Sequence, residues 1–362
     1  MWGFYYVTFY LSIYYSFILF AILMTWLTFI FQYSYVHQYI VWTWKNYYDE
    51  CRGFAKTLVH LKVPVCSIIN ILGFNSPEWL MANNGAILGG CIAAGIYATN
   101  TPEACHYITQ HSKAAVLAVE DNKQLAKYVG VNCPALKAII VWVEDVDKTI
   151  AAKVGCPVYT WAEFIALGAG VPDSTLDERE AAIKPGNCST LIYTSGTTGP
   201  PKAVMISHDN VTWTVKRMIS HYVDMNHEDR LVSFLPLSHI AAQLIDIHVP
   251  MALGCCTYFA QPDAMKGTLK NTLIDVKPTV FFGVPRVWEK MADALQAIGR
   301  STTGLKKTIS TWAKGLAAEK NNNAQFGGNG HVPLGFGCAN TIGMLYIVAV
   351  INMIIFEKFI TN

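Results

Sequence analysis

The stretch "YTSGTTGPPK", residues 193–202, decides the fold and how the rest of the chain is interpreted. It follows "STLI" (189–192), an apolar run that predicts a buried strand, and precedes "AVMISHDN" (203–210), an apolar run ending in a helix-start signal. Glycines and small residues let backbone N–H groups converge on an anion, hydroxyls add donors, and a lysine adds positive charge. Because open α/β sheets bind ligands where parallel strands end, the stretch predicts a polyphosphate cradle. Its residues are Thr194, Ser195, Gly196, Thr197, Thr198, Gly199, Pro200, Pro201 and Lys202.

Other uses of such a loop fit the spacing less well. The phosphate loop of ordinary NTPases needs glycine, lysine and then serine or threonine, whereas Gly199 is followed by Pro200. Ser195 does not lie in the G-x-S-x-G pattern of a serine nucleophile. A flexible surface loop rich in Ser, Thr and Gly is the remaining alternative. The strand expected before the stretch and the capped helix expected after it argue against that alternative.

Strand-like and helix-like segments alternate on both sides of the cradle. The run "VCSIINILGF" (65–74) predicts a buried strand, and Ser76 followed by Pro77 predicts the start of the next helix. Such alternation with short links is typical of parallel sheets covered on both faces. Residues 171–187 are polar and contain prolines, which predicts a linker or surface loop between two lobes. The expected fold class is therefore α/β, with two lobes of parallel sheet flanked by helices.

Both ends of the chain are apolar. Residues 1–44 and 335–356 contain no Asp, Glu, Lys or Arg. A segment at about 11–31 is long enough to span a bilayer, and the tail 341–362 holds a second candidate. The alternative for each is a buried core helix or a segment that belongs to no fold. We expect apolar helical ends and a membrane-associated protein whose central region faces the cytoplasm, because basic residues follow the first run.

Composition excludes two classes of partner. The chain has 27 basic and 25 acidic residues, a net charge of +2, and no Lys/Arg run, which argues against nucleic-acid binding. The ten cysteines are scattered and form no C-x-x-C pair, so no residue is predicted as a protein ligand of a metal.

The motifs together resemble a known family. The run "LIYTSGTTGPPKAVMISHDN" (191–210) resembles the signature of the adenylate-forming, AMP-binding superfamily. Further segments are similar to long-chain fatty acid–CoA ligases, and most of all to the bubblegum group. These segments are "ILGFNSPEW" (71–79), "GIYATNTPEACHYI" (95–108), "YTWAEF" (159–164), "LPLSHIAAQ" (235–243) and "FFGVPRVWEKM" (281–291). The resemblance implies the N-terminal part of an acyl-CoA synthetase fold over residues 43–340, between an apolar segment 1–42 and the tail 341–362.

The resemblance also implies a two-step reaction. A long-chain fatty acid attacks the α-phosphorus of ATP to give an acyl-adenylate, and the thiol of coenzyme A then takes the acyl group. Residues 194–202 would hold the β- and γ-phosphates with Mg²⁺, and Lys202 would add charge as pyrophosphate leaves.

Two further residues match family positions. His239 matches a position near the acyl carboxylate and the α-phosphate, and its alternative is a hydrogen-bonded histidine at a strand end. Arg286 matches a family arginine, and its alternative is a structural ion pair with Glu289. The predicted catalytic residues are thus Lys202, His239 and Arg286. Trp288 and an expected strand "TVFFGV" (279–284) would either wall an acyl tunnel or belong to the core.

The sequence departs from the family pattern at several places. Ala203 stands where glycine usually follows the lysine, and the adenine-binding, ribose-binding and second-lysine elements of the family do not occur in this sequence. Three hypotheses remain. The first is a fatty acid–CoA ligase represented by an incomplete chain that is weakly active or inactive. The second is an adenylate-former for another carboxylic acid, and the third is a non-catalytic, membrane-tethered remnant.

Overall fold

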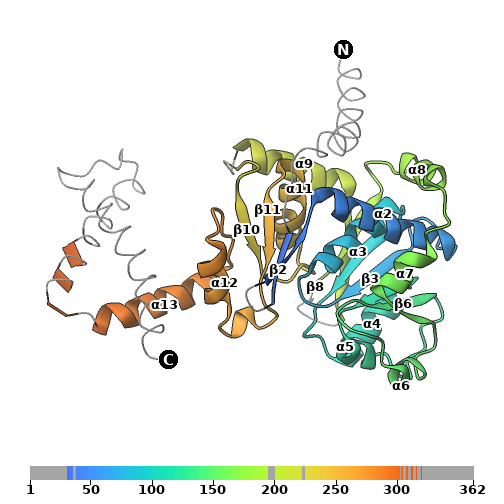
Figure 1. Cartoon of the computed structure of the whole chain (residues 1–362), viewed down its shortest axis with the longest axis horizontal. Coiled ribbons are helices and arrows are strands. Elements are labelled where there is room, and N and C mark those ends of the chain that lie inside the picture. The colour runs from blue at the N-terminus through green and yellow to red at the C-terminus, as the bar shows by residue number, and fades with distance from the viewer. Residues whose placement is uncertain are drawn as a thin grey trace, which may run out of the picture. The chain divides into compact units, whose positions relative to one another are not determined.

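The computed structural model describes residues 31–35, 38–194, 200–221 and 225–301, and also 303, 304, 307, 308, 311, 312, 315 and 319. The chain divides into two compact units, Met1–Phe282 and Gly283–Asn362. The first unit contains two sheets with their helices, and the second contains helix α13 (Pro285–Ser301) (Figure 1).

The larger sheet has seven strands in the order β7-β6-β5-β3-β4-β8-β9. Its strands are β3 (Ile68–Leu72), β4 (Ile92–Ile96), β5 (Val116–Val119), β6 (Ala138–Val141), β7 (Val158–Thr160), β8 (Cys188–Thr194) and β9 (Lys202–Ser207). Neighbouring strands are parallel except for the last pair, because β9 runs antiparallel to β8. The central strands are apolar along their length and buried on both faces, as a parallel sheet between helices requires.

Several of the helices around this sheet begin at strong capping signals. In α2 (Trp44–His60) the cap is a capping box of Thr43 and Asn46, and in α3 (Pro77–Leu88) Ser76 accepts from the Trp79 N–H. Helix α4 (Pro102–Ser112) is capped by Thr101 and has proline at its first position. The remaining helices are α5 (Asn122–Ala126), α6 (Lys148–Ala151), α7 (Trp161–Leu167) and α8 (Asp173–Ala181).

Helix α8 lies within residues 171–187, where the sequence predicted a linker or loop, so that prediction is wrong for this part. An ion-pair network holds the helix to α2. Arg52 pairs with Asp173, Asp177 and Glu180 at 2.9, 2.8 and 3.1 Å. The stabilising charge comes from a helix far away in sequence, which local patterns do not reveal.

The smaller sheet has the order β10-β11-β1-β2. Its strands are β1 (Phe31–Tyr35), β2 (Gln38–Trp42), β10 (Arg230–Ser233) and β11 (Cys256–Phe259). Strands β10 and β1 pair parallel to β11, and β2 pairs antiparallel to β1. The helices of this part are α9 (His208–His221), α10 (Ile240–Ala242), the π-helix η1 (Gln243–His248), α11 (Val249–Leu253), the 3-10 helix η2 (Ala264–Lys266) and α12 (Leu269–Val276). The prediction of two lobes of sheet flanked by helices is confirmed, but each sheet is mixed, with one antiparallel edge pair.

Strands β1 and β2 lie inside the expected apolar segment 1–42. Strand β1 alternates aromatic residues with Gln and Ser, and β2 is rich in aromatic and β-branched residues, which favours strands over a helix. The candidate membrane segment at about 11–31 otherwise lies outside the described residues, as does the tail 341–362. Within the described ranges, no helix is both long enough and apolar enough to cross a membrane.

The expected strand "TVFFGV" (279–284) is not formed. The backbone N–H groups of Thr279 and Val280 both donate to the Arg230 carbonyl, at 3.0 and 3.3 Å, so no ladder develops along β10. Phe281 stacks instead on Phe234, with the ring centroids 5.3 Å apart. Apolar content alone did not distinguish a strand from an extended segment that packs through its side chains.

Candidate functional site

The predicted cradle lies at a turn between two paired strands. Strand β8 ends at Thr194, β9 begins at Lys202, and these two residues are opposite partners in the antiparallel pair. Residues 195–199, five of the nine predicted cradle residues, lie outside the described residues. Thr194 and Lys202 are both exposed, and the Lys202 ammonium makes no hydrogen bond or ion pair to any described residue. A free ammonium and an exposed hydroxyl at the ends of this turn can both contact an anion.

Helix α4 fixes both ends of the turn. The Tyr107 hydroxyl donates to the Pro201 carbonyl at 3.2 Å, and His111 Nδ1 lies 2.9 Å from the Tyr193 hydroxyl. The Tyr107 and His111 rings stack with their centroids 5.4 Å apart. Burial raises the pKa of Tyr193, so this hydroxyl stays neutral and hydrogen-bonded. Side chains of one helix thus contact the chain just before the predicted cradle, at Tyr193, and near its end, at Pro201.

His239 lies in the segment that follows β10, and it caps helix α10. Its Nδ1 accepts the Ala241 N–H at 3.2 Å, and the residue is exposed. Because Nδ1 acts as an acceptor, the proton of the neutral imidazole is on Nε2. Nε2–H can therefore donate to an anionic oxygen, which suits the orientation of a carboxylate or phosphate better than removal of a proton.

A close contact places the His239 segment at the same sheet edge as the cradle. Strand β4 lies beside β8 in parallel register, with Ala93 opposite Thr190, so both strands end at one edge. A Cβ built on Gly95, near the end of β4, would lie 2.8 Å from the Ser238 Cα. The Ser238 side chain also hydrogen-bonds Tyr97, which follows β4. Strand β4 thus has the cradle strand on one side and the residue before His239 at its end.

Arg286 belongs to the second compact unit. It lies on α13 in the second unit, where its guanidinium pairs with Glu289 at 3.0 Å and both side chains are largely exposed. The ion pair named as the alternative is thus present, and the catalytic role of Arg286 stays a prediction. Trp288 on the same helix is about half exposed, and its Nε1 donates to the Gly283 carbonyl at 2.9 Å.

Three residues that the sequence analysis did not single out support the site. Asn75 bonds the segment that leads to His239, Gly95 permits the approach of Ser238, and Asp246 lies on the π-helix that follows α10. The only local signal for Asp246 is an acidic residue inside an apolar run. A π-helical turn is rare and occurs often at functional sites.

Asp246 is a buried carboxyl. It is 4% exposed, and burial raises its pKa to about 7, while a hydrogen bond from the Ser233 hydroxyl acts in the opposite direction. His248, two residues later, has its pKa lowered to about 4 by burial, with His208 contributing a smaller effect. The interior behind His239 therefore contains an acid that changes charge near neutral pH.

The raised pKa of Asp246 predicts a pH-dependent stability. Between its usual pKa of 3.8 and about 7, the unfolded chain loses this proton while the folded chain keeps it. The folded state is therefore destabilised progressively as pH rises through that window. We expect the free energy of unfolding of Asp246→Asn, relative to that of the wild type, to be higher at pH 8 than at pH 4 by on the order of 2–4 kcal/mol. Urea unfolding of both proteins from pH 4 to pH 8 measures this difference, in which other titrating groups cancel. A constant difference would contradict it.

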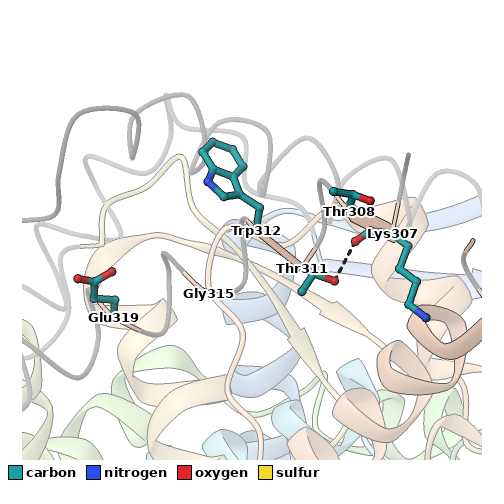
Figure 2. A pocket seen from close by; sticks show the side chains of 6 residues that line it. All are labelled: Lys307, Thr308, Thr311, Trp312, Gly315 and Glu319. Carbon is teal, nitrogen blue, oxygen red and sulfur yellow. Dashed lines mark hydrogen bonds between the residues drawn. The ribbon is translucent and has the colours of Figure 1, made fainter. Parts of the chain in front are cut away.

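The second unit carries a surface hollow of about 670 Å³. Figure 2 shows its lining side chains, with a hydrogen bond of 2.9 Å from the Thr311 hydroxyl to the Lys307 carbonyl. Its residues are Lys307, Thr308, Thr311, Trp312, Gly315 and Glu319. None of them was predicted as a site residue. In the part of the chain that the structure describes, no group of three or more His, Cys, Asp or Glu side chains could hold a metal ion.

Comparison with known proteins agrees with this geometry. The family described as "AMP-binding enzyme" matches residues 28–352, a wider range than the 43–340 inferred from the motifs. Long-chain-fatty-acid–CoA ligase ACSBG2 of Xenopus laevis is 46% identical over 305 residues, which are 83% of this chain and 40% of that protein. The human ACSBG2 is 42% identical over 300 residues, 82% of this chain and 44% of the relative. The chain thus spans less than half the length of the curated relatives that it matches.

Solved structures show the same fold. The adenylation domain of a carboxylic acid reductase from Segniliparus rugosus, in complex with AMP and a co-purified carboxylic acid, matches with a TM-score of 0.61 and 21% identity. This match covers 75% of this chain and 46% of that one. The anthranilate CoA ligase AuaEII matches with a TM-score of 0.57 and 21% identity, over 70% of this chain and 46% of that structure. With its cradle hairpin, its flanking motifs and a family match that covers most of its length, the chain belongs to the AMP-binding enzyme family and is related to the long-chain-fatty-acid–CoA ligases of the bubblegum type.

Proposed function

We propose that this chain carries the phosphate-binding half of a fatty acid–CoA ligase, which activates a long-chain fatty acid with ATP and transfers it to coenzyme A. The observation that carries the proposal is the placement of two motifs at one sheet edge. Strand β8, which leads into the predicted cradle, lies beside β4, and the end of β4 contacts Ser238, the residue before His239. The substrate class follows from the curated relatives, which are long-chain-fatty-acid–CoA ligases.

The first step joins the acid to the nucleotide. A carboxylate oxygen forms a bond to the α-phosphorus of ATP, and the bond from that phosphorus to the bridging oxygen of pyrophosphate breaks. Charge builds up on the phosphate oxygens, and the Lys202 ammonium, free of described partners, stabilises it. The acid is already ionised at neutral pH, so His239 is needed to orient it through Nε2–H rather than to remove a proton. In the second step the thiolate of coenzyme A attacks the acyl carbon and AMP leaves.

Magnesium fits this site as a companion of the nucleotide. Mg²⁺ prefers oxygen ligands and is commonly bound through substrate phosphates with few protein ligands. Thr194 presents an exposed hydroxyl at the start of the turn, and no cluster of acidic side chains in the described residues competes for the ion. When bound, Mg²⁺ would supply further neutralisation of the phosphate charge, with residues 194–202 as its surroundings.

Exchange of radiolabelled pyrophosphate into ATP tests the proposal. We expect this chain alone to show little or no exchange with palmitate, because the family's adenine- and ribose-binding elements do not occur in it. The same chain joined to the C-terminal region of the Xenopus relative is expected to exchange. Exchange only with short acids or amino acids would favour an adenylate-former of another substrate class. No exchange by either protein with any acid would favour a non-catalytic, membrane-tethered remnant.

We also propose that residues 1–30 attach the protein to a membrane, with the AMP-binding region facing the cytoplasm. The proposal rests on the uncharged composition of residues 1–44 and on the basic residues that follow them. Alkaline carbonate extraction of membranes from cells that express the chain tests attachment, and a variant without residues 1–30 is the control. Release of both proteins into the soluble fraction would contradict it.

A further inference from the structure

Asn75 links the first sheet to the segment that carries His239. It lies after β3, immediately before the Ser76 cap of α3, and is 1% exposed. Its amide nitrogen donates to the Ser233 hydroxyl oxygen at 2.8 Å and to the Leu235 carbonyl at 2.7 Å. Its amide oxygen accepts the Leu237 N–H at 3.3 Å. One buried side chain thus uses both of its donors and its acceptor on the same stretch of chain.

These three bonds cover the whole connection between β10 and His239. Ser233 is the last residue of β10, and Leu235 and Leu237 are alternate positions in the segment that leads from it to His239. A backbone held at two points by one side chain cannot slide or rotate without breaking a buried hydrogen bond. The contact of Gly95 with Ser238 then fixes the residue just before His239. Asn75 and Gly95 together fix the position of the backbone from which the His239 imidazole extends.

The network continues behind His239. An amide N–H can only donate, so the Ser233 oxygen accepts from Asn75 and its own hydrogen is available for the Asp246 carboxyl. The Gln243 N–H donates to the His239 carbonyl at 3.1 Å, and among the described residues the fully buried Gln243 amide group has no hydrogen-bond partner. A polar interior of this kind costs stability relative to an apolar one. Its position directly behind the site suggests that the cost serves function.

We propose that Asn75 is a positioning residue, which holds the segment 234–239 so that His239 stays at the sheet edge where β4 and β8 end. The proposal rests on the proposed ligase function, because the cradle is where the reacting groups would meet. Asn75 touches neither substrate nor nucleotide in this proposal. Its loss should therefore slow the chemical step and leave nucleotide binding, which depends on the turn held by α4, close to normal.

The test uses Asn75→Ala and Asn75→Asp, with Asn83→Ala as the matched control. Asn83 is also an asparagine with 1% exposure, but it lies within α3 and bonds Asn84 at 3.0 Å instead of the His239 segment. Asn75→Asp keeps an acceptor for the Leu237 N–H but replaces the donor to the Leu235 carbonyl by an oxygen. Amide hydrogen exchange of residues 234–241, measured by mass spectrometry on the 362-residue chain, reports the segment directly. Pyrophosphate exchange by the extended chain reports kcat and KM.

Both Asn75 variants are expected to raise amide exchange in residues 234–241 while the strands of the larger sheet keep their protection. We expect kcat to fall by about 100-fold, the typical cost of misplacing a reacting group by about 1 Å, with KM for ATP close to the wild-type value. Asn83→Ala is expected to change neither amide exchange in residues 234–241 nor kcat of pyrophosphate exchange. Unchanged protection of Leu237, an equal loss of protection across the whole sheet, or an unchanged kcat would each overturn the proposal. If the extended wild type shows no exchange, the ligase function fails, and amide exchange alone still decides whether Asn75 holds the segment.

Discussion

Replacing Lys202 with alanine in the extended chain is expected to lower the rate of pyrophosphate exchange by about 100-fold, which corresponds to about 2.7 kcal/mol of transition-state stabilisation. The ammonium is exposed at the end of the cradle and has no described partner, so its charge is available to the nucleotide. A unit charge about 4 Å from a phosphate oxygen near a protein surface interacts by roughly 4 kcal/mol, which is enough to supply this effect.

Lys184→Ala is the matched control for this prediction. Lys184 is also an exposed lysine, but it precedes β8 and so lies at the opposite end of the same strand from the cradle. Removing Lys184 changes the net charge of the protein by the same amount as removing Lys202, and we expect pyrophosphate exchange at the wild-type rate. Equal losses in both variants would mean that Lys202 acts only through long-range charge. An unchanged rate in Lys202→Ala would mean that the nucleotide phosphates bind elsewhere.

Gly95→Ala is expected to lower the free energy of unfolding by about 1–3 kcal/mol, the usual range for overpacking a filled interior, and to reduce exchange activity strongly. The new methyl group would lie 2.8 Å from the Ser238 Cα, and 3.0 Å from the Ser238 Cβ and from the Trp79 ring. The closest atom belongs to the backbone, so it cannot move away by a change of rotamer. The expected result is that the segment with His239 is displaced from the end of β4.

Gly170→Ala is the control, because a methyl group there would meet nothing within 4 Å. Urea unfolding gives the change in stability, and amide exchange of residues 234–241 shows whether the displacement is local. If Gly95→Ala matched Gly170→Ala in both measurements, the close approach of Ser238 to β4 would not be a constraint in solution.

The sequence predicted those parts of the fold that depend on neighbouring residues. The helix start at Ser76 and the buried strand before the cradle are confirmed. The helix-start signal in 203–210 is also confirmed, where Ser207 exchanges hydrogen bonds with Asn210. These signals lie within a few residues of one another. Helix α8 was missed because its anchoring cation, Arg52, lies more than a hundred residues earlier in the chain.

The candidate site shows the same limit. The cradle and His239 were found because their motifs are contiguous, and their roles stay predictions. Asn75 was not singled out because its partners lie about 160 residues away and a lone asparagine before a helix is an ordinary feature of turns. The raised pKa of Asp246 depends on complete burial, which only the packed structure reveals. For Arg286 the sequence offered both a motif position and an ion pair with Glu289, and the structure shows the ion pair while the catalytic role stays a prediction.

The antiparallel pairing of β8 with β9 has a consequence for how the cradle can change length. Thr194 and Lys202 are opposite partners in this pair, so the pairing fixes the two ends between which residues 195–201 run. Lengthening such a closed segment costs little in chain entropy, about 0.6 kcal/mol for each doubling. Extra glycine or serine residues inserted there should therefore hardly affect folding, while the donors that must converge on an anion become spread over a larger volume. The same insertion would then leave folding nearly unchanged and weaken nucleotide binding strongly.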